Sequence, residues 1–323
     1  MRPRRWGFAV LPLVILLGGG EGALRLAGWP KKDQGRSFTH TDVYWVEKGS
    51  LHLEPFPHKE TGGTFRVSTD ANGLRAPLHA EKKPDGVFRV MTLGCSTTFG
   101  WGVDDEQSWP ARLEAVLAEA GHPVEVINAG QPGHTSFQGL WLWDKALARY
   151  EPDLVLFGYV VQDARMVAYS DHSQALLQQN GDFLKHNLLY QSRLYTGLLQ
   201  AWNGVRMRQK EVAADGNVHR VPTDEYVANI REFETRAESV GAEFALFGFP
   251  LEREGYTASH RAVLRSAAEV LPAPYYDPQS DFERWSASET LFFPQDRGHA
   301  NAAGLDKIAR GMAQFLIAER LIP

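Results

Sequence analysis

The sequence of 323 residues has almost no cysteine, because Cys95 is the only one. A single cysteine excludes both an internal disulfide and a thiolate metal cluster. The chain also lacks a strong excess of either charge: its formal net charge is -5 and its basic residues are dispersed. We therefore expect no nucleic-acid partner, since such proteins gather their basic residues on one surface.

Long polar or repetitive stretches are missing as well. Hydrophobic residues make up 43% of the chain and charged residues 23%, which is ordinary for a globular protein. A chain of this length holds one α/β domain with additions or two small domains, and one core is the simpler expectation. Nearly everything after the N-terminus is therefore expected to fold.

The N-terminus combines positive charge with an apolar run. Arg2, Arg4 and Arg5 precede the apolar residues 6–20, which is the order found in signal peptides and signal anchors. As a helix this run rises about 22 Å, short of the ~30 Å hydrocarbon core unless residues 23–29 extend it. Residues 1–29 predict an extracytoplasmic protein held at the membrane by a signal anchor. A cleaved signal peptide is the near alternative, and a buried cytosolic helix is disfavoured by the arginines.

The rest of the chain alternates between apolar runs and amphipathic segments. Residues 30–84, rich in proline, glycine, histidine and aromatics, indicate a linker followed by short strands. Compact apolar runs then predict strands at residues 87–93, 124–127, 154–158, 243–249 and 274–276. Helical periodicity predicts helices at residues 108–121, 136–150, 223–240, 259–270 and 302–319. Leucine-rich residues 164–222 interrupt the alternation and predict a helical insertion.

Repeated strand and helix units with short connections predict an α/β fold with a parallel sheet covered on both faces. In such sheets a site forms beyond the carboxyl ends of the strands. Functional residues are therefore expected in the segments that follow each predicted strand.

Three strand ends carry residues suited to acyl transfer. Ser96 follows the first strand within a glycine-flanked turn, which exposes a serine at the sheet edge. Gly130 follows the second strand and can bring its backbone N–H close to a ligand, and Gln162 follows the third with an amide donor. Taken singly, the positions of Ser96 and Gly130 are more typical of ordinary turns, and Gln162 is equally compatible with a surface position.

The last predicted helix is preceded by an aspartate and a histidine. Asp296 and His299 are three positions apart, so in a turn the carboxylate can reach Nδ1 of the imidazole while Nε2 faces a nucleophile. Asn301 is placed to cap the helix, and a structural histidine at a helix start is the alternative. The candidate residues therefore follow one another along the chain in the order serine, glycine, glutamine, aspartate and histidine.

In that order the sequence resembles the SGNH/GDSL hydrolases. GCSTTFGWGV resembles the first block of the family, INAGQPG the glycine block, FGYVVQDAR the asparagine block and DRGHANAAG the closing block. The resemblance covers roughly residues 65–316. It includes the FRVSTDANGLRAP lead-in and the VPTDEYVANI helix found in membrane-associated bacterial members.

The resemblance implies a flavodoxin-like three-layer α/β/α sandwich with a mainly five-stranded parallel sheet, a helical insertion and an N-terminal apolar helix. It divides the chain into an anchor or signal peptide at residues 1–29, an extension at 30–84 and the hydrolase domain at 85–323. It assigns a catalytic triad and an oxyanion hole, with neither a metal nor an organic cofactor. The triad consists of Ser96, Asp296 and His299, and the oxyanion donors are Ser96, Gly130 and Gln162.

Two positions depart from the family pattern. Cys95 stands where the family usually has aspartate, and we interpret it as a small buried residue rather than as a nucleophile. Gln162 stands where the family usually has asparagine, so its amide is displaced unless the loop compensates. The loss of one oxyanion donor lowers kcat by roughly 10²–10³, so this departure predicts low or specialised activity.

These features predict a serine-dependent esterase or acyltransferase that acts on a carbohydrate or lipid ester through an acyl-enzyme. Its expected partners are the ester substrate, the membrane through the N-terminal helix, and proteins of an envelope assembly. One alternative is a catalytically inactive module of the same fold that binds polysaccharide. Another is a metal-dependent phosphoesterase with Asp163, Asp296 and His299 as ligands, disfavoured because the histidines show no paired-ligand spacing.

Overall fold

The computed structural model describes residues 7–29, 36–38, 44–167, 169–179, 192–198, 218–253, 255–271 and 273–323. Within it the chain forms two compact units. The first unit comprises Met1–Arg36 and Ser173–Asn217, and the second comprises Ser37–His172 and Val218–Pro323. The predicted strands of the α/β core all lie in the second unit.

The core of the second unit is a sheet of five parallel strands in the order β11-β10-β7-β5-β6. The strands are β5 (Arg89–Leu93), β6 (Glu125–Asn128), β7 (Leu154–Phe157), β10 (Glu243–Phe247) and β11 (Tyr275–Tyr276). Every residue of β5 and β7 is buried, as expected for strands covered on both faces. The prediction of an α/β fold with a five-stranded parallel sheet is confirmed.

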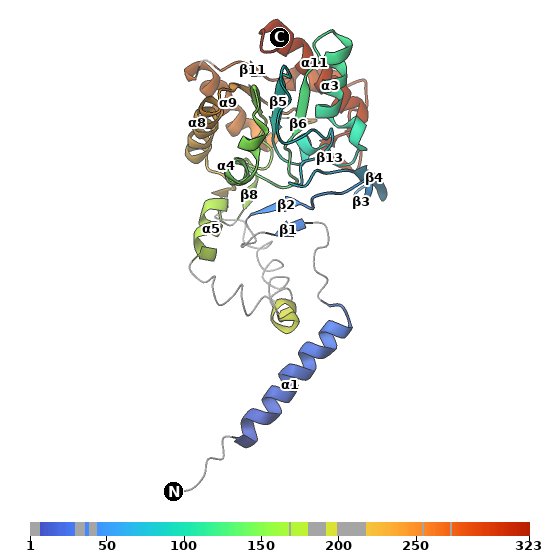
Figure 1. Cartoon of the computed structure of the whole chain (residues 1–323), viewed down its shortest axis with the longest axis vertical. Helices are drawn as coiled ribbons and strands as arrows, with labels where there is room; N and C mark the ends of the chain where they lie inside the picture. The colour runs from blue at the N-terminus through green and yellow to red at the C-terminus, as the bar shows by residue number, and fades with distance from the viewer. Residues whose placement is uncertain are drawn as a thin grey trace. The chain divides into compact units, whose positions relative to one another are not determined.

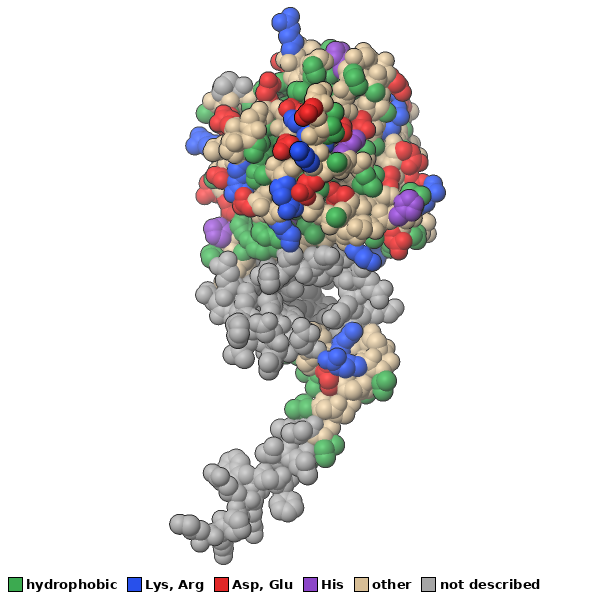
Figure 2. Space-filling model, viewed as in Figure 1, with side chains coloured by type: hydrophobic (Ala, Val, Ile, Leu, Met, Phe, Trp, Pro, Cys, Tyr) green, Lys and Arg blue, Asp and Glu red, His purple; other side chains and the backbone are tan. Residues whose placement is uncertain are grey.

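Helices cover both faces of the sheet. Figure 1 shows α8 (Thr223–Ser239) and α9 (Ala258–Val270) on one side and α3 (Trp109–Glu119) and α11 (Ala302–Ala318) on the other. The apolar stripe of α11 is buried, as its periodicity predicts: Leu305, Ile308, Met312 and Leu316. Figure 2 shows acidic and basic side chains interspersed over the described part of the face in view, so that part carries no extended field of one sign.

The strand order reverses next to β5. The chain passes from β5 to its neighbour β6 and then returns past β5 to β7, on the other side. In open α/β sheets the crevice at such a reversal is where ligands bind, beyond the carboxyl ends of the strands. The segments after β5, β6 and β7 are therefore the place to look for a site.

Several elements differ from the predicted ones. The helix predicted at residues 136–150 is divided into α4 (Ser136–Lys145) and a 3₁₀ turn, Leu147–Tyr150, because Ala146 adopts φ -142° and ψ -46°. The N-terminal extension, in contrast, contains short strands as predicted. They form two pairs, β1 (Arg36–Phe38) with β2 (Trp45–Glu47), and β3 (Glu54–His58) with β4 (Gly63–Val67).

The insertion begins and ends in strands that the sequence pattern did not predict. β8 (Met166–Val167) pairs antiparallel with β9 (Val218–His219), so the predicted helical insertion, residues 164–222, contains a short strand near each end. Strands of two residues are too short to show an alternating pattern. Between them α5 (Asp171–Gln179) is helical as predicted, and most of the remaining insertion lies outside the described residues.

The N-terminal run forms a helix, α1 (Gly7–Leu26), which contains Pro12. Within the same unit Glu21 accepts hydrogen bonds from the backbone N–H groups of Arg193 and Leu194, and these bonds lower its pKa to about 2. Among the described residues we find no helix with the length and apolar character of a membrane span. The structure therefore does not support the predicted transmembrane anchor.

Candidate active site

Ser96 lies at the carboxyl end of β5, where it is the first residue of a one-turn helix, α2 (Ser96–Phe99). Two glycines make this sharp connection possible. A Cβ atom on Gly94 would lie 2.1 Å from Thr98 Oγ1, and Gly100 ends the helix in the left-handed region at φ 85°. Ser96 itself is buried with 6% of its surface exposed.

Ser96, His299 and Asp296 form one hydrogen-bonded chain. The distance between His299 Nε2 and Ser96 Oγ is 2.7 Å, and that between His299 Nδ1 and Asp296 Oδ2 is 2.6 Å. Ser96 and His299 are 203 positions apart in the chain, so only the fold brings them together. The contacts match a nucleophile, a base and an orienting acid, while their catalytic roles remain a prediction.

Asp296 and His299 lie on a strand rather than in the predicted turn. β13 (Asp296–Ala300) pairs antiparallel with β12 (Phe292–Phe293), and the register shifts between Phe292, which faces Ala300, and Phe293, which faces Asp296. Two adjacent residues thus face partners four positions apart. The segment between Asp296 and Ala300 therefore bulges out of the strand. This bulge allows the side chains of Asp296 and His299, three positions apart, to contact each other.

A second histidine contacts the carboxylate of Asp296. His58, on β3, is 2% exposed and places Nε2 3.3 Å from Asp296 Oδ2. Burial raises the pKa of Asp296, but hydrogen bonds and charge from His299 and His58 outweigh it, so the net shift is downward. Sequence analysis missed His58 because nothing in the proline-rich extension distinguishes it from other polar residues.

The same carboxylate belongs to the one group of potential metal ligands found among the described residues. Ligand atoms of His58, Glu60 and Asp296 lie within 4.8 Å of one another. One imidazole and two carboxylates suit a divalent ion such as Zn²⁺, but a cation there would compete with His299 for Asp296. The ligand set Asp163, Asp296 and His299, which the phosphoesterase alternative requires, is not brought together.

Two of the predicted oxyanion donors, Gly130 and Gln162, differ in whether their N–H groups already have a hydrogen-bond partner. The N–H of Gly130 donates to Asn128 Oδ1 at 3.1 Å, and a Cβ on Gly130 would lie 2.3 Å from the backbone nitrogen of Phe99. Close packing of this loop on α2 therefore requires glycine independently of catalysis. Gln162 accepts a hydrogen bond at Oε1 from Arg220 at 2.9 Å, and its Nε2 has no protein partner within the described ranges.

Cys95 directly precedes Ser96 and is buried, with 1% of its surface exposed. Its Sγ lies 3.2 Å from Thr97 Oγ1, and burial raises the pKa of the thiol. A raised pKa disfavours the thiolate that a cysteine nucleophile requires. The position of Cys95 is thus that of a packing residue.

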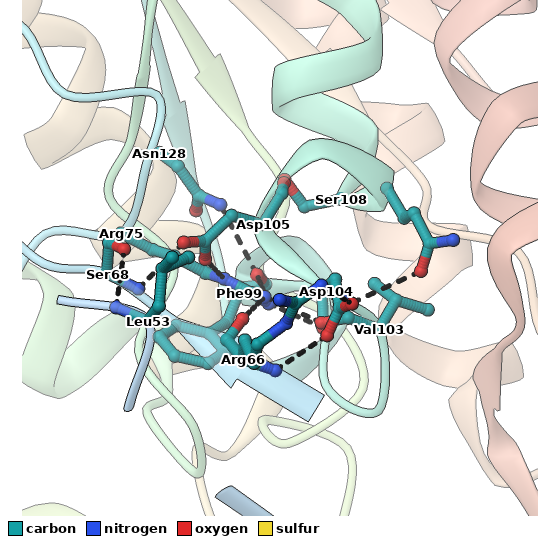
Figure 3. Close-up of polar contacts among 12 residues, drawn as sticks. Leu53, Arg66, Ser68, Arg75, Phe99, Val103, Asp104, Asp105, Ser108 and Asn128 are labelled. Atoms are coloured by element: carbon teal, nitrogen blue, oxygen red, sulfur yellow. Dashed lines mark hydrogen bonds and ion pairs between the residues drawn. The ribbon is translucent and has the colours of Figure 1, made fainter. Parts of the chain in front are cut away.

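A buried arginine from the N-terminal extension holds the turn that follows Ser96 (Figure 3). Arg75 is fully buried, and its N–H groups all find oxygen acceptors at 2.6 to 3.2 Å: Asp105, Phe99, Gly100, Val103 and Arg66. Its backbone N–H also donates to the carbonyl oxygen of Asn128. The extension is therefore part of the framework that fixes α2.

Asp163 is a buried carboxylate next to Gln162. Its Oδ1 accepts hydrogen bonds from the backbone and side chain of Ser136, and its buried Oδ2 has no partner among the described residues. Burial raises the pKa of Asp163 to about 7, although Ser136 and the charge of Arg220 act in the opposite direction. The carboxyl is therefore half protonated near neutral pH.

Asp163 makes the stability of the protein depend on pH. In the native state the pKa of Asp163 is raised from its ordinary value of 3.8 to about 7. The contribution of its protonated carboxyl to the free energy of unfolding is therefore fully present below pH 4 and is lost as the pH rises towards 7. Asp163→Asn removes this titration, so the stability of the variant relative to wild type should rise by a few kcal/mol between pH 5 and pH 8. Urea unfolding at both pH values measures it, with exposed Asp85→Asn as control. Equal pH dependence of wild type and Asp163→Asn would contradict the prediction.

Comparison with known proteins finds a family match over most of this site. Residues 92–307 match the model of the GDSL-like Lipase/Acylhydrolase family. An arylesterase of Vibrio mimicus is 38% identical over 68 residues, 21% of this chain and 34% of that protein. Esterase TesA of Pseudomonas aeruginosa is 36% identical over 67 residues, 21% of this chain and 33% of that protein. The chain thus spans about a third of the length of these curated relatives.

Among solved structures, a lipase/acylhydrolase from Enterococcus faecalis is similar at a TM-score of 0.49 and 15% identity. The similarity covers 72% of this chain and 97% of that one. At this level the likeness decides nothing about chemistry, which depends on the geometry described above.

Proposed function

Because the chain belongs to the GDSL-like lipase/acylhydrolase family, we propose that it is a serine-dependent ester hydrolase or acyltransferase with Ser96 as its nucleophile. The observation that carries the proposal is the chain of hydrogen bonds from Ser96 Oγ through His299 to Asp296. The 2.7 Å contact between Ser96 Oγ and His299 Nε2 is already short enough for proton transfer, and the 2.6 Å contact with Asp296 holds the imidazole in place. The family membership and the geometry thus support the same chemistry.

The proposed reaction has two steps. His299 Nε2 takes the proton of Ser96 as Oγ attacks the ester carbonyl; the protonated imidazole then gives that proton to the leaving alcohol, and an acyl-enzyme forms. In the second step water, or a hydroxyl group of an acceptor, loses its proton to His299 and attacks the acyl carbon. The bond between Ser96 Oγ and the acyl carbon then breaks, His299 returns the proton to Oγ, and the acid or the new ester leaves. Asp296 orients the imidazole and stabilises its charged form.

The oxyanion of each step would be met by the N–H of Ser96 and the amide of Gln162, with Gly130 as a third donor. Use of Gly130 requires its N–H to be shared with Asn128, to which it is bonded in this structure. The third donor is therefore weaker than the other two, which supports the expectation of low or specialised activity.

For the substrate we propose a carbohydrate or lipid ester. The relatives named above are called an arylesterase and an esterase, which supports ester chemistry. The arginines followed by an apolar run at the N-terminus support an extracytoplasmic location and membership of the membrane-associated type. Fractionation of expressing cells tests the location, and recovery of the chain in the cytoplasm would refute it.

The test of function uses the purified full chain with p-nitrophenyl esters of increasing acyl length and with an acetylated glycan. A fluorophosphonate probe should label the enzyme covalently at Ser96. Ester hydrolysis that survives Ser96→Ala and disappears with a chelator would instead indicate a metal-dependent hydrolase. Absence of both labelling and ester hydrolysis would indicate the inactive binding module, which the engaged Gly130 N–H favours.

A further inference from the structure

Two of the loops that carry the proposed oxyanion donors are held by one guanidinium group. Arg220 Nη1 donates to Gln162 Oε1 at 2.9 Å and to the backbone carbonyl oxygen of Gly133 at 2.8 Å. Gln162 follows β7, and Gly133 lies in the glycine-rich turn that contains Gly130. One side chain thus sets the separation of the two loops.

Arg220 is itself fixed by a carboxylate. Its Nε and Nη2 donate to the two oxygens of Asp171 at 3.0 and 2.8 Å, and only 13% of the Arg220 side chain and 4% of that of Asp171 are exposed. Asp171 also accepts from Thr135 Oγ1 at 2.8 Å. A bidentate pair of this kind fixes the plane and position of a guanidinium.

The contact with Arg220 determines which end of the Gln162 amide is available to bind an oxyanion. Its oxygen is taken by an obligate donor, so its NH₂ group, without a partner in the described part of the protein, is the end that can meet an oxyanion. A glutamine carries one more methylene than asparagine, and its amide is therefore less well defined unless it is held. Arg220 supplies that restraint.

We infer that Arg220 is a positioning residue: it orients the Gln162 amide and sets the spacing of the Gln162 and Gly130 loops, and so makes glutamine serviceable as an oxyanion donor. The inference rests on the proposed function. Arg220 lies outside all four family blocks, at the end of the insertion, and is 58 positions from Gln162. It needs no contact with the substrate.

The principal test is Arg220→Lys in the full chain, assayed with p-nitrophenyl acetate. Lysine keeps the charge beside Asp171 but cannot serve a bidentate carboxylate and two carbonyl oxygens at once. We expect kcat to fall about 10-fold to 100-fold while KM changes less than about 3-fold, because a donor that meets only the oxyanion affects the transition state. Unchanged kcat would overturn the inference.

A double-mutant cycle separates positioning from general structural damage. In a Gln162→Ala background the amide is gone and only the effect on the weaker Gly130 donor remains, so Arg220→Lys should lower kcat by less than about 3-fold. The same loss in both backgrounds would show that Arg220 does not act through Gln162. If Arg220→Lys fails to fold, Asp171→Asn replaces it: this milder change loosens Arg220 and should lower kcat by roughly 3-fold to 10-fold, again only when Gln162 is present.

Arg236→Lys is the matched control, because Arg236 also joins a backbone carbonyl oxygen, that of Leu140, to a carboxylate, that of Asp144. It should leave kcat within about 2-fold of wild type. Failure of the proposed function would show as wild-type protein without Ser96-dependent hydrolysis. Failure of this inference would show as Ser96-dependent hydrolysis in which Arg220→Lys equals Arg236→Lys.

Discussion

Replacement of Ser96 by alanine is expected to lower kcat for a p-nitrophenyl ester by at least about 10⁴-fold. The substitution removes the one oxygen that His299 Nε2 contacts at 2.7 Å, and with it the acyl-enzyme route. The remaining groups can only bind the ester and polarise its carbonyl. Steady-state rates and fluorophosphonate labelling measure the loss, and both should vanish together.

Cys95→Ala is the neighbouring control. Cys95 is buried beside Thr97, so this substitution should reduce stability slightly and leave kcat within about 3-fold. If Ser96→Ala retained most of the hydrolytic rate, or if Cys95→Ala abolished it, Ser96 would not be the nucleophile. Equal loss in both variants with loss of the folded signal would indicate damage to α2.

Asp296→Asn is expected to lower kcat by roughly 10³-fold to 10⁴-fold with little change in KM. The amide oxygen can still accept from His299 Nδ1, but the negative charge that stabilises the protonated imidazole is lost. Because the net shift of the Asp296 pKa is downward, the carboxylate stays ionised throughout the neutral range. The deficit of the variant should therefore be similar at pH 6, 7 and 8.

Asp306→Asn provides the matched comparison. Burial raises the pKa of Asp306, but hydrogen bonds and charge from Arg310 and Arg112 lower it overall, so Asp306 is a second paired carboxylate, placed on α11. Its replacement should leave kcat within about 2-fold. A loss of less than 10-fold in Asp296→Asn would remove Asp296 from the triad and leave His299 oriented by other groups.

Local patterns were sufficient to predict the framework. Strands β5, β6, β7 and β10 are short apolar runs between turn residues, and α11 repeats leucine, isoleucine and methionine on one face. These patterns depend only on residues close together in the sequence, so the strands and the helix can be predicted without knowledge of the tertiary structure. The strand pair β12 and β13, in contrast, has a register shift that no local periodicity reveals.

The sequence by itself determined which chemistry-bearing residues follow each strand, because the order of Ser96, Gly130, Gln162, Asp296 and His299 is a property of the chain. Only the tertiary structure decided that Ser96 and His299 touch, and that His58, Arg75 and Arg220 support the site. His58 and Arg75 lie in the proline-rich extension and Arg220 lies at the end of the insertion, and none of them follows a periodic pattern. Hydrogen bonds between segments tens or hundreds of positions apart depend on how the strands are ordered and where the loops close, which no local preference of the chain encodes.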